Sequence, residues 1–110
     1  MASLPNYLRT NRKKLALSQE EVAFLLGVTG EYKAIKASRD ENTVREPTLR
    51  AALAYEAVYG RPVRELFAGL YEEVERDGAT RARILGHRTP TRPRPKLQEV
   101  IARLVSKISA

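Results

Sequence analysis

The segment SQEEVAFLLG, from Ser18 to Gly27, limits the possible folds of this chain more than any other stretch. Ser18 is a favoured N-cap residue, and Glu21, three positions later, can return the contact in a capping box. The apolar residues that follow at helical spacing are Val22, Ala23, Leu25 and Leu26. Gly27 can adopt the left-handed conformation that ends many helices. A helix of about two turns is predicted, and so short a helix must pack on neighbouring elements.

Helical patterns continue on both sides of this segment, and the alternation typical of strands is absent. We expect helices over about 5–15, from Thr29 onward, over 48–59, and over 62–77. In the helix that follows Thr29, either Tyr32 or Ile35 is expected to be the main buried anchor. In the next helix, the residues at helical spacing are Leu49, Ala52, Leu53 and Ala57, with Tyr55 as a further candidate. The sequence therefore predicts an all-α protein.

The net charge of +7 is concentrated in the last third of the chain. Residues 1–78 hold 12 Lys/Arg and 12 Asp/Glu, whereas residues 79–110 hold eight Lys/Arg and a single acid, Glu99. A basic segment on a neutral body is typical of proteins that bind polyanions. A solvated tail that only keeps the protein soluble would have the same composition.

The sequence offers few of the residue types on which catalytic sites are commonly built, so an enzyme is not predicted. There is no cysteine, and the single histidine, His87, lies in an Arg/Pro-rich stretch without a nearby carboxylate. We therefore expect no catalytic residue, no metal site and no cofactor. No apolar run approaches the length of a membrane span, and the first residues have no signal-peptide core. The expected location is cytoplasmic, without a membrane partner.

Two stretches carry a family resemblance. LSQEEVAFLLGVT resembles the signature of the Cro/C1-type (Xre-like) helix-turn-helix DNA-binding family, and EPTLRAALAYEAVYGRPVRELF is similar to its fourth and fifth helices. The resemblance covers roughly residues 4–70. It implies a five-helix lambda-repressor-like domain whose third helix lies in the major groove of duplex DNA. The segment between Gly27 and Pro47 is longer than is usual in the family, so the placement of that third helix is the open point.

The resemblance also implies roles for particular residues. Gln19 matches a family glutamine that touches a phosphate, although an ordinary first-turn polar residue would look the same. Arg12 matches an arginine that pairs with a glutamate at the end of the third helix, for which Glu41 is the candidate. An exposed pair without structural importance is the alternative.

The remaining DNA-binding candidates are cationic or small polar residues. In the third helix and the turn before it they are Thr29, Lys33, Lys36, Ser38 and Arg39. Lysine and arginine donate to guanine O6 and N7 or to phosphates. In the Pro-rich stretch the candidates are Arg88, Arg92 and Arg94, which could follow phosphates or enter a minor groove. A solvated helix face and a disordered linker are the respective alternatives.

The predicted organisation has three parts: a helix-turn-helix domain over 1–78, a basic Pro/Arg linker over 79–95, and an amphipathic helix over 96–110. The apolar stripe of that last helix is Leu97, Ile101, Leu104 and Ile108. We predict a DNA-binding transcriptional regulator, a repressor, that acts as a homodimer on duplex DNA. An antitoxin or accessory protein that binds a protein partner through 96–108 is the alternative. A degenerate domain that binds protein or RNA is a third possibility.

Overall fold

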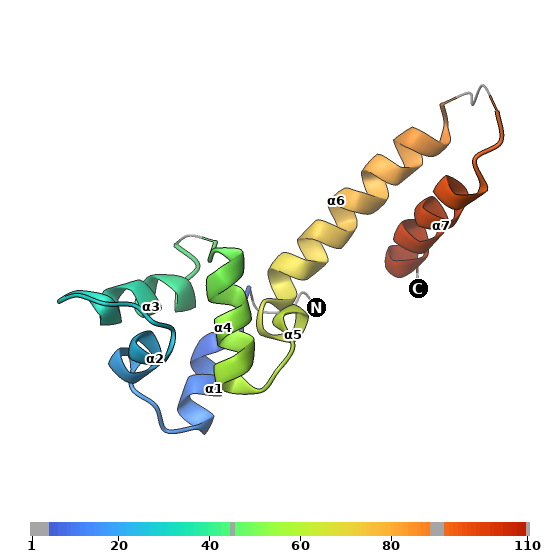
Figure 1. Ribbon diagram of the computed structural model, residues 1–110. Helices are drawn as coiled ribbons and strands as arrows, with labels where there is room; N and C mark the ends of the chain where they lie inside the picture. The colour runs from blue at the N-terminus through green and yellow to red at the C-terminus, as the bar shows by residue number, and fades with distance from the viewer. Residues whose placement is uncertain (1–4, 45, 89–91, 110) are drawn as a thin grey trace. The chain divides into compact units, whose positions relative to one another are not determined.

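The computed structural model describes residues 5–44, 46–88 and 92–109, with side chains up to Lys107 (Figure 1). Across these ranges the chain forms seven α-helices and no strand, so the all-α prediction is confirmed. The helices are α1 Leu8–Lys14, α2 Gln19–Leu25, α3 Lys33–Glu41, α4 Leu49–Tyr59, α5 Val63–Leu66, α6 Ala68–Gly86 and α7 Pro95–Ser109. Residues 89–91 of the predicted linker and the side chain of Ile108 lie outside the described residues.

The chain divides into two compact units, Met1–Leu70 and Tyr71–Ala110, rather than at residue 78. The single helix predicted over 62–77 is instead two helices, since the backbone breaks at Phe67 (φ −117°, ψ 46°). α6 then continues through Gly78 to Gly86, so the prediction of a linker beginning at residue 79 was wrong. A glycine inside a helix costs only about 1 kcal/mol relative to alanine, and the Ala, Arg and Leu residues that follow favour a helix.

The predicted start and end of α2 are both present. The N–H of Glu21 donates to Ser18 Oγ at 3.0 Å, and the N–H of Ser18 donates to Glu21 Oε1 at 2.8 Å. Gly27 has φ 82°, a left-handed conformation that residues with a Cβ adopt only at a cost. These local contacts fix α2 to two turns and direct the chain toward α3.

The core of the first unit is built around two tyrosines of α4. Its buried members are Leu8, Val22, Tyr55, Tyr59, Leu66 and Phe67. Leu49 and Leu53, expected to face the core, are 75% and 53% exposed. α4 is apolar on nearly every side, so periodicity alone does not identify its buried face. The aromatic face is buried because it offers the larger apolar area and because Tyr55 has a hydrogen-bond partner.

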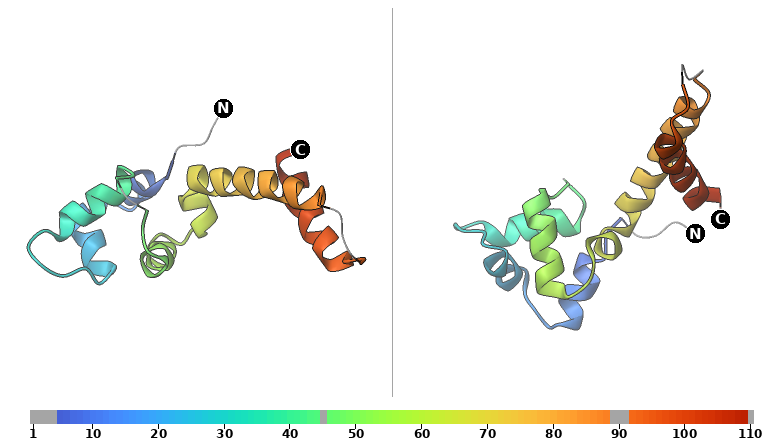
Figure 2. Two further views of the ribbon diagram at one scale, coloured as in Figure 1. Left: turned by 90° about the horizontal axis from the view of Figure 1, so that it is seen from above. Right: turned by 45° about the vertical axis from the view of Figure 1, so that its right-hand side comes forward.

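The second unit is a helical hairpin in which α6 and α7 run antiparallel (Figure 2). Ala79 and Ala82 of α6 are buried, whereas Leu97, Ile101 and Leu104 of α7 are half-buried. A Cβ placed on Gly78 would lie 3.4 Å from Leu104 Cδ2, so small residues on α6 receive the large side chains of α7.

Candidate nucleic-acid interface

α2 and α3 lie side by side (Figure 1). Together they carry most of the residues that the sequence predicts to bind nucleic acid. The seven residues between them, 26–32, contain two glycines with positive φ, Gly27 at 82° and Gly30 at 105°. The turn before α3 is therefore long, and α3 begins only at Lys33. α3 itself has nine residues.

α3 is held by its C-terminal half and not by the residues expected to anchor it. Tyr32 is 67% exposed and Ile35 is 45% exposed, so the prediction that one of them is the buried anchor was wrong. The buried residues of α3 are Ala37, Asp40 and Glu41. These three share one side of the helix at helical spacing, and two of them are acidic. A buried carboxylate needs partners, and both acids have them.

Glu41 is the centre of a polar cluster that joins three helices. Its side chain is 1% exposed, and its Oε2 lies 2.6 Å from Arg12 Nε. Arg12 Nη2 donates to Oε1 at 3.3 Å, which makes the pair bidentate, and Gln19 Nε2 donates to the same oxygen at 3.2 Å. The hydrogen bond with the Glu41 carboxylate raises the pKa of Arg12. The cluster ties the start of α2 and the middle of α1 to the end of α3.

Asp40 is held by a hydrogen bond from α4. The Tyr55 hydroxyl donates to Asp40 Oδ2 at 2.7 Å, with both residues buried. Burial, and then this hydrogen bond, raise the pKa of Tyr55 well above its usual range. Burial also raises the pKa of Tyr59 to about 12. Both tyrosines are therefore uncharged at physiological pH.

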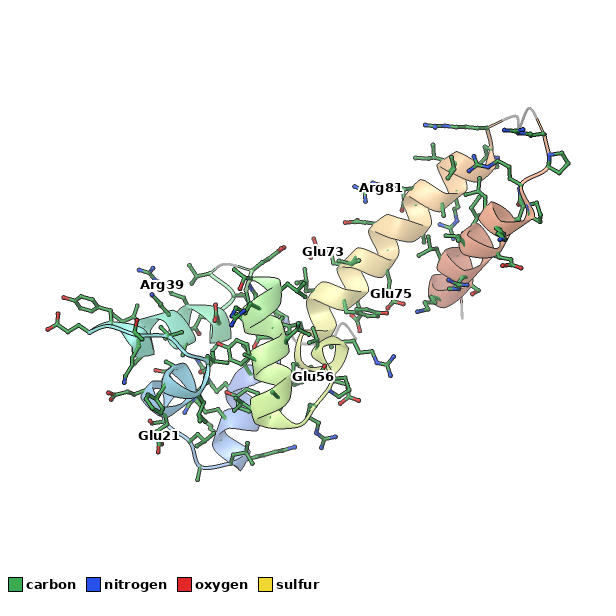
Figure 3. All side chains as sticks on the ribbon, viewed as in Figure 1. Glu21, Arg39, Glu56, Glu73, Glu75 and Arg81 are labelled. Carbon is green, nitrogen blue, oxygen red and sulfur yellow. The ribbon has the colours of Figure 1, made fainter. Side chains whose placement is uncertain are left out.

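The opposite face of α3 is open to solvent and cationic. Lys36 and Arg39 are exposed and three residues apart, and Figure 3 shows Arg39 pointing away from the unit. Tyr32 and Ile35 lie on this outward side as well, an arrangement that sequence reasoning missed because it counted them as core. Ser38 is half-buried and accepts a hydrogen bond from Asn42 Nδ2 at 3.3 Å. Thr29 is exposed in the turn before α3.

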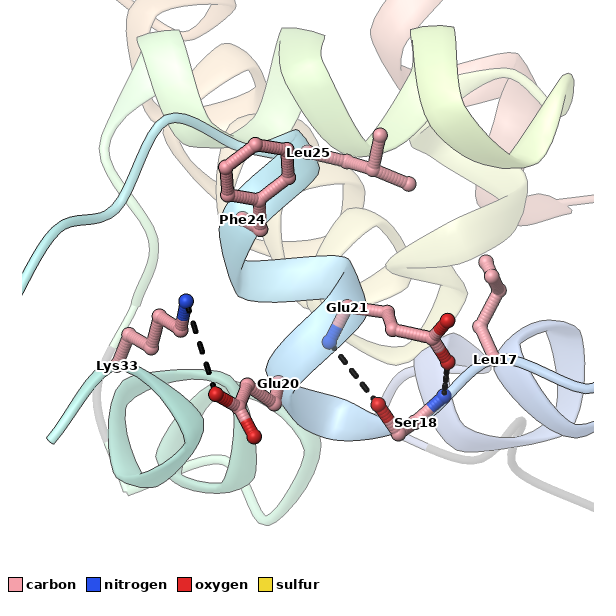
Figure 4. Close-up of a pocket in the computed structure, with 7 residues that line it drawn as sticks. All are labelled: Leu17, Ser18, Glu20, Glu21, Phe24, Leu25 and Lys33. Atoms are coloured by element: carbon pink, nitrogen blue, oxygen red, sulfur yellow. Dashed lines mark hydrogen bonds and ion pairs between the residues drawn. The ribbon is translucent and has the colours of Figure 1, made fainter. Parts of the chain in front are cut away.

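Lys33 differs from the other two cations of α3 because α2 holds it. Its Nζ lies 3.7 Å from Glu20 Oε1 and 5.4 Å from the centre of the Phe24 ring. The Lys33 side chain is only 25% exposed. It borders an open hollow of about 480 Å³, whose remaining lining is Leu17, Ser18, Glu20, Glu21, Phe24 and Leu25 (Figure 4). Lys33 is thus partly neutralised, whereas Lys36 and Arg39 belong to no ion pair among the described residues.

The three arginines proposed for the tail belong to the second unit. Arg88 follows the end of α6, and Arg92 and Arg94 precede α7. All three are exposed. Gln19 and the candidate residues of α3 therefore belong to the first unit, and the three arginines belong to the second.

The described residues also bear on whether the chain has a metal site or a membrane-spanning helix. Among the described residues, no group of three His, Cys, Asp or Glu side chains is arranged to hold a metal ion. In the same residues, no helix is both long enough and apolar enough to cross a membrane. No family model, curated protein or solved structure matches the chain.

Proposed function

We propose that the chain is a sequence-specific transcriptional regulator, a repressor, that reads duplex DNA with α3 in the major groove. In this proposal the first unit is a helix-turn-helix domain of the Cro/C1 type, with α2 and α3 as the paired helices. The observation that carries the proposal is the division of α3 into two faces. One face is fixed by Asp40 and Glu41, and the other presents Lys36 and Arg39 to solvent.

The physical chemistry of DNA binding fits this division. A reading helix must be held rigidly, because a shift of its axis would misplace every base contact. The bidentate Arg12–Glu41 pair provides such a hold. Cations on the outer face can donate to phosphates or to guanine O6 and N7. The exposed Tyr32 and Ile35 offer apolar contact of the kind that thymine methyl groups accept.

The proposed active species is a homodimer on a palindromic operator, because one helix of nine residues reads few base pairs and twofold symmetry doubles the site. The proposal includes no enzymatic activity, cofactor or membrane partner, and it places the protein in the cytoplasm.

Selection of genomic DNA fragments with the purified protein tests the proposal. The expected result is enrichment of a specific duplex at physiological salt. Replacement of Lys36 or Arg39 by alanine should weaken binding to that duplex at least about tenfold, if each makes a good base contact. The matched control is Lys33→Ala, whose smaller effect is expected because Glu20 already pairs with Lys33. If no duplex is enriched over random DNA, the regulator proposal is wrong.

A second candidate function is binding of a protein partner through α7, as in an antitoxin or accessory factor. Its support is that Val100 is 43% exposed although α6 covers part of α7. Selection with a chain truncated after Gly86 separates the two functions. DNA binding that survives the truncation, together with loss of a co-purifying partner, would favour the second.

A further inference from the structure

α6 has a second face that α7 does not cover. Val74 is 58% exposed and Ile84 is 56% exposed, and Asp77 and Arg81 are exposed between them. In Figure 3, Arg81 projects from the side of α6 away from α7. Glu75 projects from the other side, where Lys107 Nζ lies 3.8 Å from its Oε2.

The four exposed residues, Val74, Asp77, Arg81 and Ile84, are spaced by three, four and three positions, and we call them the α6 seam. This is the spacing of the a and d positions of a heptad, the positions by which one helix packs along another. The seam is apolar at both ends and has one negative and one positive charge in its centre. No described residue of the chain forms an ion pair with either charge.

The seam is complementary to itself when two copies run antiparallel. If the twofold axis is level with residue 79, Val74 lies opposite Ile84 of the second copy, because both are five positions from the axis. Asp77 then lies opposite Arg81 of the second copy, and the same two contacts occur again on the other side of the axis. Antiparallel helices pair a positions with d positions, and each of these pairs joins one a to one d.

A parallel arrangement of the same seam is unfavourable. It would place Asp77 against Asp77 and Arg81 against Arg81, and like charges across a helix interface are destabilising. The wider charge pattern of α6 agrees, since residues 72–77 hold four acids and one arginine, whereas residues 78–86 hold two arginines and no acid. Antiparallel pairing places the acidic half of one α6 beside the basic half of the other.

Of the other two exposed apolar residues of α6, Leu85 is 37% exposed and lies at the edge of the seam. Tyr71 lies on the side that α7 contacts, where Lys107 Nζ is 6.0 Å from the centre of its ring. Three of the four large apolar residues of α6 that stay exposed in one chain therefore lie in or beside the seam. Among the described residues of this unit, only Ala79 and Ala82 are buried, so the hairpin has little core of its own and additional burial favours association.

We propose that a second copy of this chain docks on the α6 seam, antiparallel and about a twofold axis, with two Asp77–Arg81 ion pairs across the interface. This contact would supply the dimer that palindromic DNA needs. The association itself requires no DNA, so its test stands or falls separately from the proposed function.

Charge reversal and mixing test the seam in the full-length protein. Wild type should sediment at the mass of two chains. Asp77→Arg and Arg81→Asp should each raise the dimer dissociation constant at least about tenfold, because each places two like-charged pairs across the axis. An equimolar mixture of the two variants should form a heterodimer, since every seam charge of one variant then faces an opposite charge of the other. The control Arg83→Asp changes the charge equally on an exposed residue outside the seam and should leave the dimer intact.

A second measurement does not depend on charge. The chain contains no cysteine, so Val74→Cys and Ile84→Cys each introduce a single thiol. Under mild oxidation a mixture of these two variants should form disulfide-linked dimers faster than either variant alone. A monomeric wild type at all soluble concentrations would overturn the proposal. So would charge-reversal variants that stay dimeric, or a mixture that fails to associate although circular dichroism shows both variants to be helical.

Discussion

Two arginines of α1 contact the same carboxylate in different surroundings. Arg12 is 14% exposed and 2.6 Å from Glu41, whereas Arg9 is 52% exposed and 3.6 Å from it. Removing Arg12 leaves a buried carboxylate without its bidentate partner, whereas removing Arg9 loses a half-exposed contact and an exposed hydrogen bond to Asn42 Oδ1, both of which water can replace. The two positions therefore form a matched pair for measuring how burial changes the contribution of an ion pair.

We predict that Arg12→Ala lowers the free energy of unfolding by about 3–5 kcal/mol. Arg9→Ala should lower it by less than about 1 kcal/mol, because an exposed pair is screened by water. Urea unfolding followed by circular dichroism measures both. Equal losses for the two variants would mean that Glu41 is solvated in solution.

The two buried tyrosines of α4 form a second matched pair. Tyr55 donates to Asp40 at 2.7 Å, whereas the Tyr59 hydroxyl has no hydrogen-bond partner among the described residues. Tyr55→Phe should lower the free energy of unfolding by about 1–3 kcal/mol, since it removes a hydrogen bond to a buried carboxylate. Tyr59→Phe should leave stability unchanged or slightly raised. Thermal unfolding of both variants measures these changes in stability. A larger loss of stability for Tyr59→Phe than for Tyr55→Phe would contradict the hydrogen bonding of the two tyrosines.

The helices show which parts of the fold can be predicted from the sequence. Ser18, Glu21, Gly27 and Gly60 mark helix ends through contacts or dihedral angles within a few residues, and the corresponding ends were predicted correctly. The buried faces of α3 and α4 were predicted only in part, because they depend on distant partners: Tyr55 and Glu41 were candidates, whereas Asp40 was not. Tyr55 of α4 donates to the buried Asp40, and that contact joins residues 15 positions apart. The burial of Asp40 therefore could not be predicted from the sequence of α3 alone.

The capping box of α2 makes a testable contribution to the pH dependence of stability. The backbone N–H of Ser18, and then its hydroxyl, lower the pKa of Glu21 below its ordinary value of 4.5. A carboxylate with a lowered pKa in the folded state stabilises the protein above its unfolded pKa, and this contribution is lost as the pH falls through the folded pKa. Glu21→Gln should therefore be less stable than wild type at neutral pH, and the difference should shrink below pH 4.5. Urea midpoints measured across this range provide the test, and a difference that persists at low pH would exclude the charge as its cause.

At the scale of the whole molecule, the two units carry different kinds of positive charge. In the first unit, Lys36 and Arg39 lie on a helix that buried side chains hold in place. In the second, Arg88, Arg92 and Arg94 occur among prolines between two helices. A cation on a fixed helix can read a base edge, whereas a cation that contacts only phosphate adds affinity without selecting a sequence. We therefore expect the first unit to set specificity and the tail arginines to set affinity and its salt dependence.

Replacing Arg88, Arg92 and Arg94 together by alanine separates these contributions. The logarithm of the DNA association constant falls linearly with the logarithm of salt concentration, with a slope of about 0.9 per neutralised phosphate. The triple variant should therefore lose up to about 2.7 from that slope, equally for the selected duplex and for random DNA. The matched control replaces Arg61, Arg64 and Arg103 by alanine. These arginines are also exposed, and their replacement lowers the net charge by the same amount. If the control loses as much slope as the triple variant, total charge and not the tail determines the electrostatic attraction. If only the tail variant loses slope while its preference for the selected duplex remains, the tail arginines bind phosphates and α3 provides the specificity.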